Sequence, residues 1–356
     1  MDIIVIVGGQ FGGEGKGKLT SYLCKNEDIA AVVRCGGPNS GHTITLDGKQ
    51  TVLRQIPAGI VNPKTKLLLA AGCLIDLKVL QGEIKAFNIN PNMLGIDRNA
   101  IIIDEDDINI ENEIKLKERI GSTCTGVGSA VSKRVLRGNN LRIAKDIIDL
   151  RKYITDTSDE LMSYSKGNNK IIIEGTQGFG LSLYHSPYYP YATSRDTTAA
   201  AFLSEAGVSP IVLSDIIMVI RTFPIRVAGN SGPLPNEIDW EIIRKESGYP
   251  FKIEEFTSVT KKLRRVGRID LALIKKAITI NKPTIIALMG IDYIDYSSKD
   301  ATHYNHLSDK AKSFISWIEW EIGAKISLIG TGPRDDNLVD IQFIGLNLRG
   351  KERWAR

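Results

Sequence analysis

A glycine-rich segment near the N-terminus, residues 8–18, has the composition of a phosphate-binding loop. It holds six glycines and two lysines in eleven residues and follows a strand-like apolar run. A strand, a glycine turn and a helix start direct backbone N–H groups and the helix dipole toward an anion, and a lysine adds a point charge. However, five residues separate Gly9 from Gly15, and Gly17 stands where a P-loop has Ser or Thr. The segment therefore predicts a phosphate site of a non-standard kind, the alternative being a flexible glycine loop at a sheet edge.

Two further segments carry groups suited to phosphoryl and carboxylate chemistry. His42 lies in the sequence Asn-Ser-Gly-His-Thr, and an imidazole can hold or release a proton near neutral pH. Residues 258–265 combine hydroxyl and cationic side chains, which together suit an anionic ligand. The alternatives are a loop histidine that only forms hydrogen bonds, and a solvated basic face.

The composition is that of an ordinary globular protein of 356 residues, 42% hydrophobic and 24% charged. A net charge of +5 argues against a dedicated nucleic-acid binder and is compatible with a small-anion site. No apolar run has the length of a membrane span, and the first strand leaves no room for a signal peptide. We therefore expect reduced cysteines, a cytoplasmic location and neither a nucleic-acid nor a membrane partner.

Short apolar runs alternate with helix-like stretches along the chain. We expect strands over residues 2–7, 29–34, 67–69, 101–103, 171–173, 210–213, 285–288 and 326–329. We expect helices over residues 17–25, 144–165, 197–206, 269–280 and 308–322. This alternation predicts an α/β fold with a mostly parallel central sheet flanked by helices. We expect a single domain over residues 1–356, with site-forming loops around residues 36–43, 121–137 and 230–265.

The glycine-rich loop is followed, in order, by four more motifs. They are Asn39-Ser40-Gly41-His42-Thr43, Gly121-Ser122-Thr123, Glu174-Gly175-Thr176-Gln177-Gly178 with residues 189–194, and Gly330-Thr331-Gly332-Pro333. With this set the chain resembles the adenylosuccinate synthetase family from Met1 to about Asp335. The resemblance implies a P-loop-like fold, a homodimer and a ligase of purine biosynthesis. Such enzymes join L-aspartate to C6 of a 6-oxopurine nucleotide while cleaving a nucleoside triphosphate.

This reaction moves the γ-phosphate to O6 before the aspartate amine displaces it, so positioned cations and donors matter most. The resemblance gives catalytic roles to Lys16, His42 (as an acid) and Gln177, and implies Mg2+ on the backbone carbonyl of Gly41. Residues implied at the triphosphate are Gly12, Gly15, Lys16, Gly17, Lys18, Gly41, His42, Thr43, Asp292, Gly330, Thr331, Gly332 and Pro333. Those implied at the purine monophosphate are Gly13, Asn39, Ser122, Thr123, Arg137, Gln177, Thr193 and Val227. Those implied at aspartate are Ser258, Val259, Thr260, Lys262 and Arg264.

Position 13 departs from the family pattern, in which an aspartate takes the N1 proton of inosinate and contacts magnesium. Gly13 can do neither, and the loss of a general base costs about 10²–10⁴-fold in rate. The missing carboxylate would leave space beside N1 and C2 for a 2-amino group. Gly13 resembles the viral branch of the family, the 2-aminoadenylosuccinate synthetases, which act on deoxyguanylate on the way to diaminopurine DNA in phages. We therefore predict dGMP as the acceptor, with backbone carbonyls near Ser40 and Gly13 accepting from its amino group.

Two other departures concern the donor and the aspartate. Gly290 replaces a lysine that precedes the guanine-reading Asp292 by two residues, and the viral branch is associated with ATP or dATP. We therefore expect an adenine donor, with GTP as the alternative. Lys261-Lys262-Leu263 replaces a Gly-Arg-Arg run, so we expect Arg264 or Arg265 to take part in binding aspartate. Arg137 would reach the monophosphate from the neighbouring subunit, unless it is a solvated basic residue.

Three other functions remain open from the sequence. One is an ordinary adenylosuccinate synthetase that uses inosinate and GTP. Another is an inactive nucleotide-binding relative, against which the presence of Lys16, His42 and Gln177 argues. A P-loop NTPase switch is the third, and Gly17 argues against it because such a switch needs Ser or Thr after the lysine.

Overall fold

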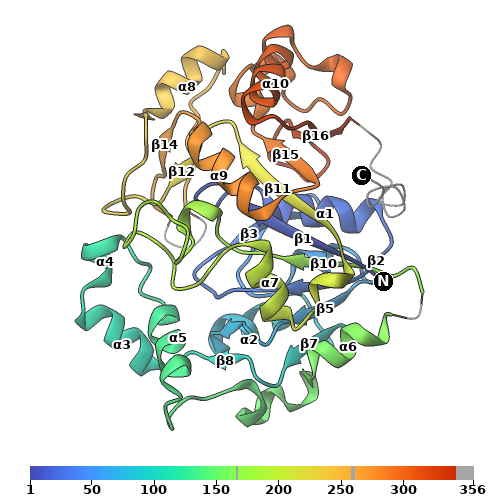
Figure 1. Cartoon of the computed structure of the whole chain (residues 1–356), viewed down its shortest axis with the longest axis vertical. Coiled ribbons are helices and arrows are strands. Elements are labelled where there is room, and N and C mark those ends of the chain that lie inside the picture. The colour runs from blue at the N-terminus through green and yellow to red at the C-terminus, as the bar shows by residue number, and fades with distance from the viewer. Residues whose placement is uncertain (166, 258–260, 342–356) are drawn as a thin grey trace.

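A ten-stranded sheet forms the centre of the computed structural model, which describes residues 1–165, 167–257 and 261–341 (Figure 1). In pairing order its strands are β17 (Leu338–Asp340), β16 (Ile326–Gly330), β15 (Ile285–Met289), β11 (Leu213–Arg221), β1 (Asp2–Gly8), β10 (Lys170–Glu174), β2 (Ile29–Arg34), β5 (Lys66–Leu69), β7 (Leu94–Asp97) and β9 (Ile154–Thr155). The described neighbouring pairs are parallel, apart from the antiparallel pair β16–β17. The predicted α/β fold with a mostly parallel sheet is confirmed.

Helices cover both faces of the sheet because its central strands are apolar on both sides. In β1, Ile4 and Ile6 pack in a core that includes residues of α1 (Lys16–Asn26). Ile3 and Val5 face a second core that includes residues of α7 (Ala199–Ala206). The phosphate loop therefore leaves the middle of the sheet directly into α1.

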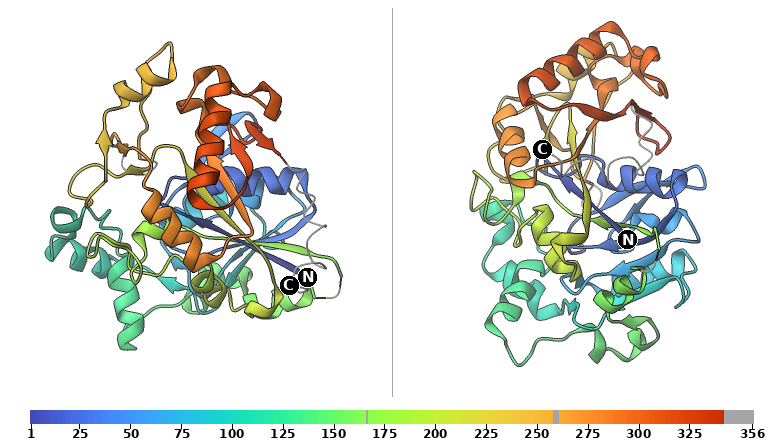
Figure 2. Two further views of the ribbon diagram at one scale, coloured as in Figure 1. Left: turned by 45° about the horizontal axis from the view of Figure 1, so that its top comes forward. Right: turned by 45° about the vertical axis from the view of Figure 1, so that its right-hand side comes forward.

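The remaining elements surround this centre (Figures 1 and 2). Helices α9 (Leu271–Asn281) and α10 (Asp309–Ile322) lie toward the β15–β16 end of the sheet, and α2 (Leu77–Ala86) and α6 (Thr157–Ser163) toward the β7 end. One side carries α3 (Glu105–Glu113), α4 (Leu116–Ile120) and α5 (Val127–Leu136). Two small sheets have two strands each: the hairpin of β3 (His42–Leu46) and β4 (Lys49–Leu53), and the pair of β6 (Leu74–Ile75) and β8 (Ile101–Ile102). A third sheet has three strands, in the order β12 (Ile225–Arg226), β14 (Arg265–Gly267) and β13 (Glu237–Ile238). Helix α8 (Trp240–Ser247) follows β13 in the chain. No described helix is long and apolar enough to cross a membrane.

The prediction of a single helix over residues 144–165 is wrong. The segment instead forms two short 3₁₀ turns, strand β9 and helix α6. Its first backbone N–H groups form hydrogen bonds outside the segment, since Ala144 N donates to Ala100 O and Lys145 N donates to Arg98 O. The Asp156 side chain then accepts from Asp159 N and starts a separate helix. Tertiary pairing and a new N-cap override the helical pattern.

Two predicted strands are displaced. Residues 210–212 form a 3₁₀ turn, because Pro210 opens it and the Ser209 hydroxyl accepts from Ile211 N. Strand β11 therefore begins at Leu213 and extends to Arg221. Residues 101–102 do form a strand, but β8 pairs with β6 outside the main sheet. Helices α2, α3, α4 and α5 were not predicted.

Candidate active site

The phosphate loop is built on left-handed backbone. Gly12, Gly13 and Gly15 have φ values of 86°, 70° and 103°, a region that side chains disfavour. The buried carboxylate of Glu14 accepts from Gln10 N at 3.1 Å and Gly12 N at 2.8 Å, and so folds the loop on itself. This geometry explains why residues 8–18 need so many glycines.

Lys16 and the backbone of Gln177 meet across this loop. Lys16 Nζ lies 2.7 Å from Glu14 Oε2 and also donates to the backbone carbonyl of Gln177. Gln177 itself has a positive φ of 63°, in the left-handed region. The Gln177 backbone also lies against Gly12. Lys16 is thus held buried by an acid and a carbonyl at the start of α1.

His42 packs directly on the first turn of α1. A Cβ added at Gly17 would lie 2.5 Å from His42 Cβ, closer than real contacts allow. Glycine at position 17, where a P-loop has a hydroxyl residue, therefore lets the imidazole approach Lys16 and the loop.

A buried carboxylate orients His42. Glu174 Oε1 lies 2.5 Å from His42 Nδ1, and Arg34 Nη1 lies 2.8 Å from the same nitrogen. Burial and Arg34 lower the pKa of His42 to about 4. Burial alone would raise the pKa of Glu174, but His42 and Arg34 lower it to about 2. Glu174 can accept from His42 only if Nδ1 carries a hydrogen, and a guanidinium has only donors, so the Arg34 contact is then not a hydrogen bond to Nδ1. In this tautomer of the neutral ring, Nε2 is the lone-pair acceptor.

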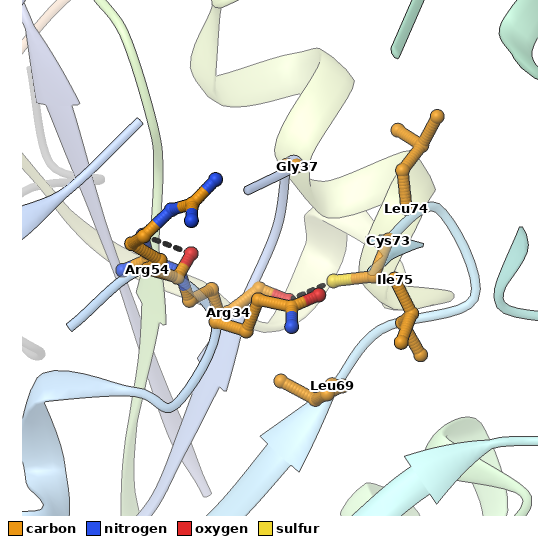
Figure 3. Close-up of a pocket in the computed structure, with 9 residues that line it drawn as sticks. Arg34, Gly37, Arg54, Leu69, Cys73, Leu74 and Ile75 are labelled. Carbon is orange, nitrogen blue, oxygen red and sulfur yellow. Dashed lines mark hydrogen bonds between the residues drawn. The ribbon is translucent and has the colours of Figure 1, made fainter. Parts of the chain in front are cut away.

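A small cavity lies behind the loop of residues 36–43, and Figure 3 shows the arginines that line it. Arg54 Nε donates to Pro38 O at 2.9 Å, and Arg34 Nη2 donates to Arg54 O at 3.1 Å and to Ser40 O at 3.3 Å. The two guanidinium groups brace the segment that presents His42. The Ser40 carbonyl, proposed from the sequence as an acceptor for an amino group, already accepts one hydrogen bond.

The turn after β16 is fastened to α1. Lys18 Nζ donates to Gly332 O at 2.7 Å and to Asn337 O at 2.6 Å. Burial lowers the pKa of Lys18 to about 8. Thr331 Oγ1 donates to Ala301 O at 2.8 Å, and Pro333 O accepts from Gln50. The Lys18 bonds bring the predicted triphosphate residues 330–333 to the start of α1.

Asp292 lies in the same region but already has a partner. It is buried just after β15, and the Tyr249 hydroxyl donates to its Oδ2. Burial raises the pKa of Asp292. Rings of Tyr249 and Tyr296 lie 4.6 Å apart beside it. Sequence reasoning did not anticipate this tyrosine.

The space beside Gly13 is not empty, contrary to the expectation from the missing carboxylate. A Cβ on Gly13 would lie 2.8 Å from Ile225 Cδ1 and 3.4 Å from Arg264 Nη1. Arg221 Nη1 donates to Gly13 O at 3.1 Å and to Glu255 Oε2 at 3.0 Å. Burial opposes ionisation of Glu255, but Arg221 keeps its pKa below the usual value. An apolar side chain and two arginines therefore surround position 13.

Comparisons with known proteins show which family this chain belongs to. Residues 5–149 and 141–299 match the adenylosuccinate synthetase family. The chain belongs to the adenylosuccinate synthetase family. An adenylosuccinate synthetase of Methanocaldococcus jannaschii is 40% identical over 342 residues, 95% of this chain and 96% of the relative. One from Pyrococcus horikoshii is 36% identical over 345 residues, 96% and 98% of the two chains.

Two solved structures share the fold. Adenylosuccinate synthetase from Plasmodium falciparum, fully ligated, has a TM-score of 0.85 at 22% identity, covering 96% of this chain and all (100%) of the other. The succinoaminodeoxyadenylate synthetase of cyanophage S-2L, bound to dGMP and to dATP as an energy donor, has a TM-score of 0.80 at 26% identity, covering 96% and 95%. The chain is thus a carbon–nitrogen ligase of the adenylosuccinate synthetase family.

The residues predicted to bind the purine monophosphate come from several loops. Ser122 Oγ accepts from Cys124 N, and Thr123 Oγ1 lies 3.2 Å from Thr125 Oγ1. A Cβ on Gly121 would lie 2.9 Å from Ser231 Cα, so the 121–125 loop packs against the segment that contains Val227. Ser231 Oγ donates to Val227 O at 2.6 Å.

The other predicted acceptor residues differ in placement. Thr193 N donates to Leu181 O, and the Asn39 side chain lies against Gly37. Arg137 is exposed at the end of α5, beside the exposed Val135 and Leu136. It does not join the buried contacts around Lys16 and His42 that the structure describes.

The segment predicted to bind aspartate is only partly described, since Ser258, Val259 and Thr260 lie outside the described residues. Lys262 is exposed, and its backbone N–H donates to Thr257 Oγ1 at 2.9 Å. Arg264 points toward Gly13, whereas Arg265 pairs with Glu237. Of the two arginines expected to help bind aspartate, the geometry favours Arg264.

The residues present fit a magnesium ion that arrives with the triphosphate. The described residues contain no cluster of three or more His, Cys, Asp or Glu able to hold a metal. Gly41 precedes His42 and offers a carbonyl oxygen, a ligand type that Mg2+ accepts alongside substrate phosphates. Glu14 is already used by Lys16 and two loop amides.

Sequence reasoning missed Glu174, Arg34, Arg221 and Ile225. Glu174 belonged to a recognised motif but received no role. Its signal was available, because an acid at the carboxyl end of a strand buried on both faces needs a charged or hydrogen-bonded partner. Ile225 gave no such signal, since an isoleucine in a short apolar run predicts only core packing.

Proposed function

We propose that this ligase joins L-aspartate to C6 of dGMP and cleaves ATP or dATP to the diphosphate and phosphate. The product would be 2-amino-2'-deoxy-N6-succinoadenylate, a precursor for diaminopurine DNA, made by a cytoplasmic homodimer of a single domain over residues 1–356. Gly13 is the observation that carries the acceptor assignment.

No described carboxylate beside Gly13 is free to replace the missing acid. Glu14 accepts from Lys16 and two loop amides, and Glu255 is paired with the buried Arg221. Inosinate and deoxyguanylate both carry a hydrogen on N1, so the reaction with either acceptor would lack this carboxylate base. We propose that the proton leaves to water or to a substrate phosphate oxygen.

The acceptor's amino group would find hydrogen-bond acceptors in the loop backbone. The Gly13 carbonyl accepts from Arg221 with one lone pair and keeps another, and the same holds for the Ser40 carbonyl beside Arg34. A buried N–H₂ that meets such an acceptor is favoured, whereas inosinate, which lacks it, leaves the acceptor unpaired.

Tyr249 supports an adenine donor. Guanine would present two N–H donors to the Asp292 carboxylate, but the tyrosine hydroxyl already donates to this group. The cyanophage enzyme of similar fold was solved with dATP as its energy donor.

The catalytic groups then take the roles that the family implies. Lys16 and the loop amides would hold the moving phosphoryl group, and Mg2+ would neutralise charge on the phosphates. Because Nε2 of His42 is unprotonated in the free protein, the acid role requires a proton at Nε2 once the anionic triphosphate is bound. Glu174 acts as a positioning residue through its bond to Nδ1.

The ordinary reaction, with inosinate and GTP, is the second candidate. Overall sequence similarity favours this ordinary reaction over the reaction with dGMP. The archaeal relatives named adenylosuccinate synthetase are 36–40% identical, against 26% for the cyanophage enzyme. The retained Asp292 is compatible with GTP. Overall similarity does not address position 13, however, and that position decides the proposal.

A substrate panel separates the candidates. Purified protein with aspartate and Mg2+ is supplied with inosinate, guanylate or deoxyguanylate, each with ATP or GTP, and diphosphate release is followed. We expect turnover with deoxyguanylate and ATP. Turnover of inosinate and GTP alone would support the ordinary enzyme, and no product in any combination would support an inactive relative.

A further inference from the structure

We propose that Ile225 is a specificity-determining residue of the acceptor-base site and acts as a pair with Gly13. This inference rests on the proposed function for its acceptor. It starts from a contact, since Ile225 Cδ1 lies 2.8 Å from where a Cβ on residue 13 would be. The side chain absent at position 13 is thus replaced in space by one from a distant segment.

The position of Ile225 is fixed from two directions. Ile225 pairs with Val266 in the β12–β14 ladder and is 1% exposed. The loop itself is fastened to the segment of residues 221–226. Gln10 exchanges hydrogen bonds of 3.1 and 2.9 Å with the Arg221 backbone. The Arg226 guanidinium lies 4.5 Å from the Phe11 ring centre.

The contact between Gly13 and Ile225 affects the part of the site that would face the N1–C2 edge of the acceptor base. If residue 13 borders N1 and C2 of the acceptor, as proposed, then the buried methyl end of Ile225 packs directly behind that edge. This packing is apolar and takes no proton, and it blocks the return of an acid at position 13. Restoring the aspartate alone would press a carboxylate against Ile225 and beside Arg264, the proposed aspartate-binding arginine.

A double-mutant cycle tests the contact. Gly13→Ala adds only the Cβ, and Ile225→Val removes only Cδ1. Gly48→Ala is the matched control, because Gly48 has a similar φ of 75° but open space around its Cβ. We expect Gly13→Ala to lower Tm more than Gly48→Ala in the wild-type background. In the Ile225→Val background, Gly13→Ala and Gly48→Ala should lower Tm by nearly the same amount, because only the backbone strain remains at both positions. A Gly13→Ala chain that folds only in the Ile225→Val background would show the same coupling.

Acceptor choice tests the role in specificity. We expect Ile225→Val to lower kcat/KM for deoxyguanylate by up to about tenfold and to change inosinate less, as for one methyl group in a pocket. Gly13→Asp/Ile225→Val should gain inosinate turnover over Gly13→Asp alone. Additive Tm effects, or an acceptor ratio unchanged by Ile225→Val, would overturn the pairing. If the wild-type protein uses only inosinate, the proposed function fails, while the cycle still decides whether the two residues are paired.

Discussion

The protonation state of His42, a residue of a recognised motif, depends on partners that are far away in the sequence. The motif predicts a proton-transferring imidazole, but its state depends on Glu174 and Arg34. Neither partner lies within the motif, and no periodicity connects β2, β3 and β10. The sequence therefore identifies the group, and only the fold defines which nitrogen carries the proton. The same holds for Gly13, whose neighbour Ile225 is distant in sequence.

The buried imidazole predicts a pH dependence of stability. The folded protein holds His42 neutral down to a pKa of about 4, whereas the unfolded chain binds the proton near 6.5. Stability should therefore fall as pH drops from 6.5 toward 4. In His42→Gln this part of the slope should disappear. Urea unfolding of both proteins at pH 7 and pH 5 measures it, and an equal loss in both would show that His42 does not contribute.

At the scale of elements, the parallel strands and their following helices were predictable because they are apolar on both faces and long enough to be distinct. The segment of residues 144–165 was not, since its backbone pairs with residues 98–100. The same long-range pairing assembles the site. Asp335 joins α1 to the β3–β4 hairpin, since it accepts from Ser21, Lys25 and Thr45 N.

This junction predicts a selective loss in Asp335→Asn. The charge that holds three donors disappears, so we expect Tm to fall by a few degrees and KM for the triphosphate to rise, by roughly tenfold. KM for deoxyguanylate should change little. Asp336→Asn is the control, because Asp336 is exposed and its side chain forms an ion pair with the exposed Arg334. An equal effect of both substitutions on triphosphate KM would contradict the junction's role.

At the scale of the whole molecule, the sheet gathers its loops at the carboxyl ends of β1, β10 and β11. Arg137 is the exception, because it is exposed next to Val135 and Leu136, which are 71% and 74% exposed. An apolar pair beside a predicted phosphate-binding arginine is consistent with a subunit interface. The monomer alone does not bring this arginine into the site that the structure describes.

Hybrid dimers test that prediction. Arg137→Ala and His42→Gln should each lower activity strongly as separate proteins. If Arg137 acts across the interface, mixed dimers contain one intact site, so subunit exchange should restore about a quarter of wild-type activity. Size-exclusion chromatography of the mixture confirms that dimers form. Failure to recover activity in exchanged dimers would place Arg137 outside the partner's site.

Direct competition between acceptors tests the central claim that Gly13 marks a 2-aminopurine site. Wild-type protein receives equal concentrations of deoxyguanylate and inosinate with ATP, aspartate and Mg2+, and the two succinylated products are separated and quantified. The account predicts an excess of the 2-amino product of at least about tenfold, as expected when a buried acceptor is left unpaired by the competitor. A predominance of adenylosuccinate would contradict it.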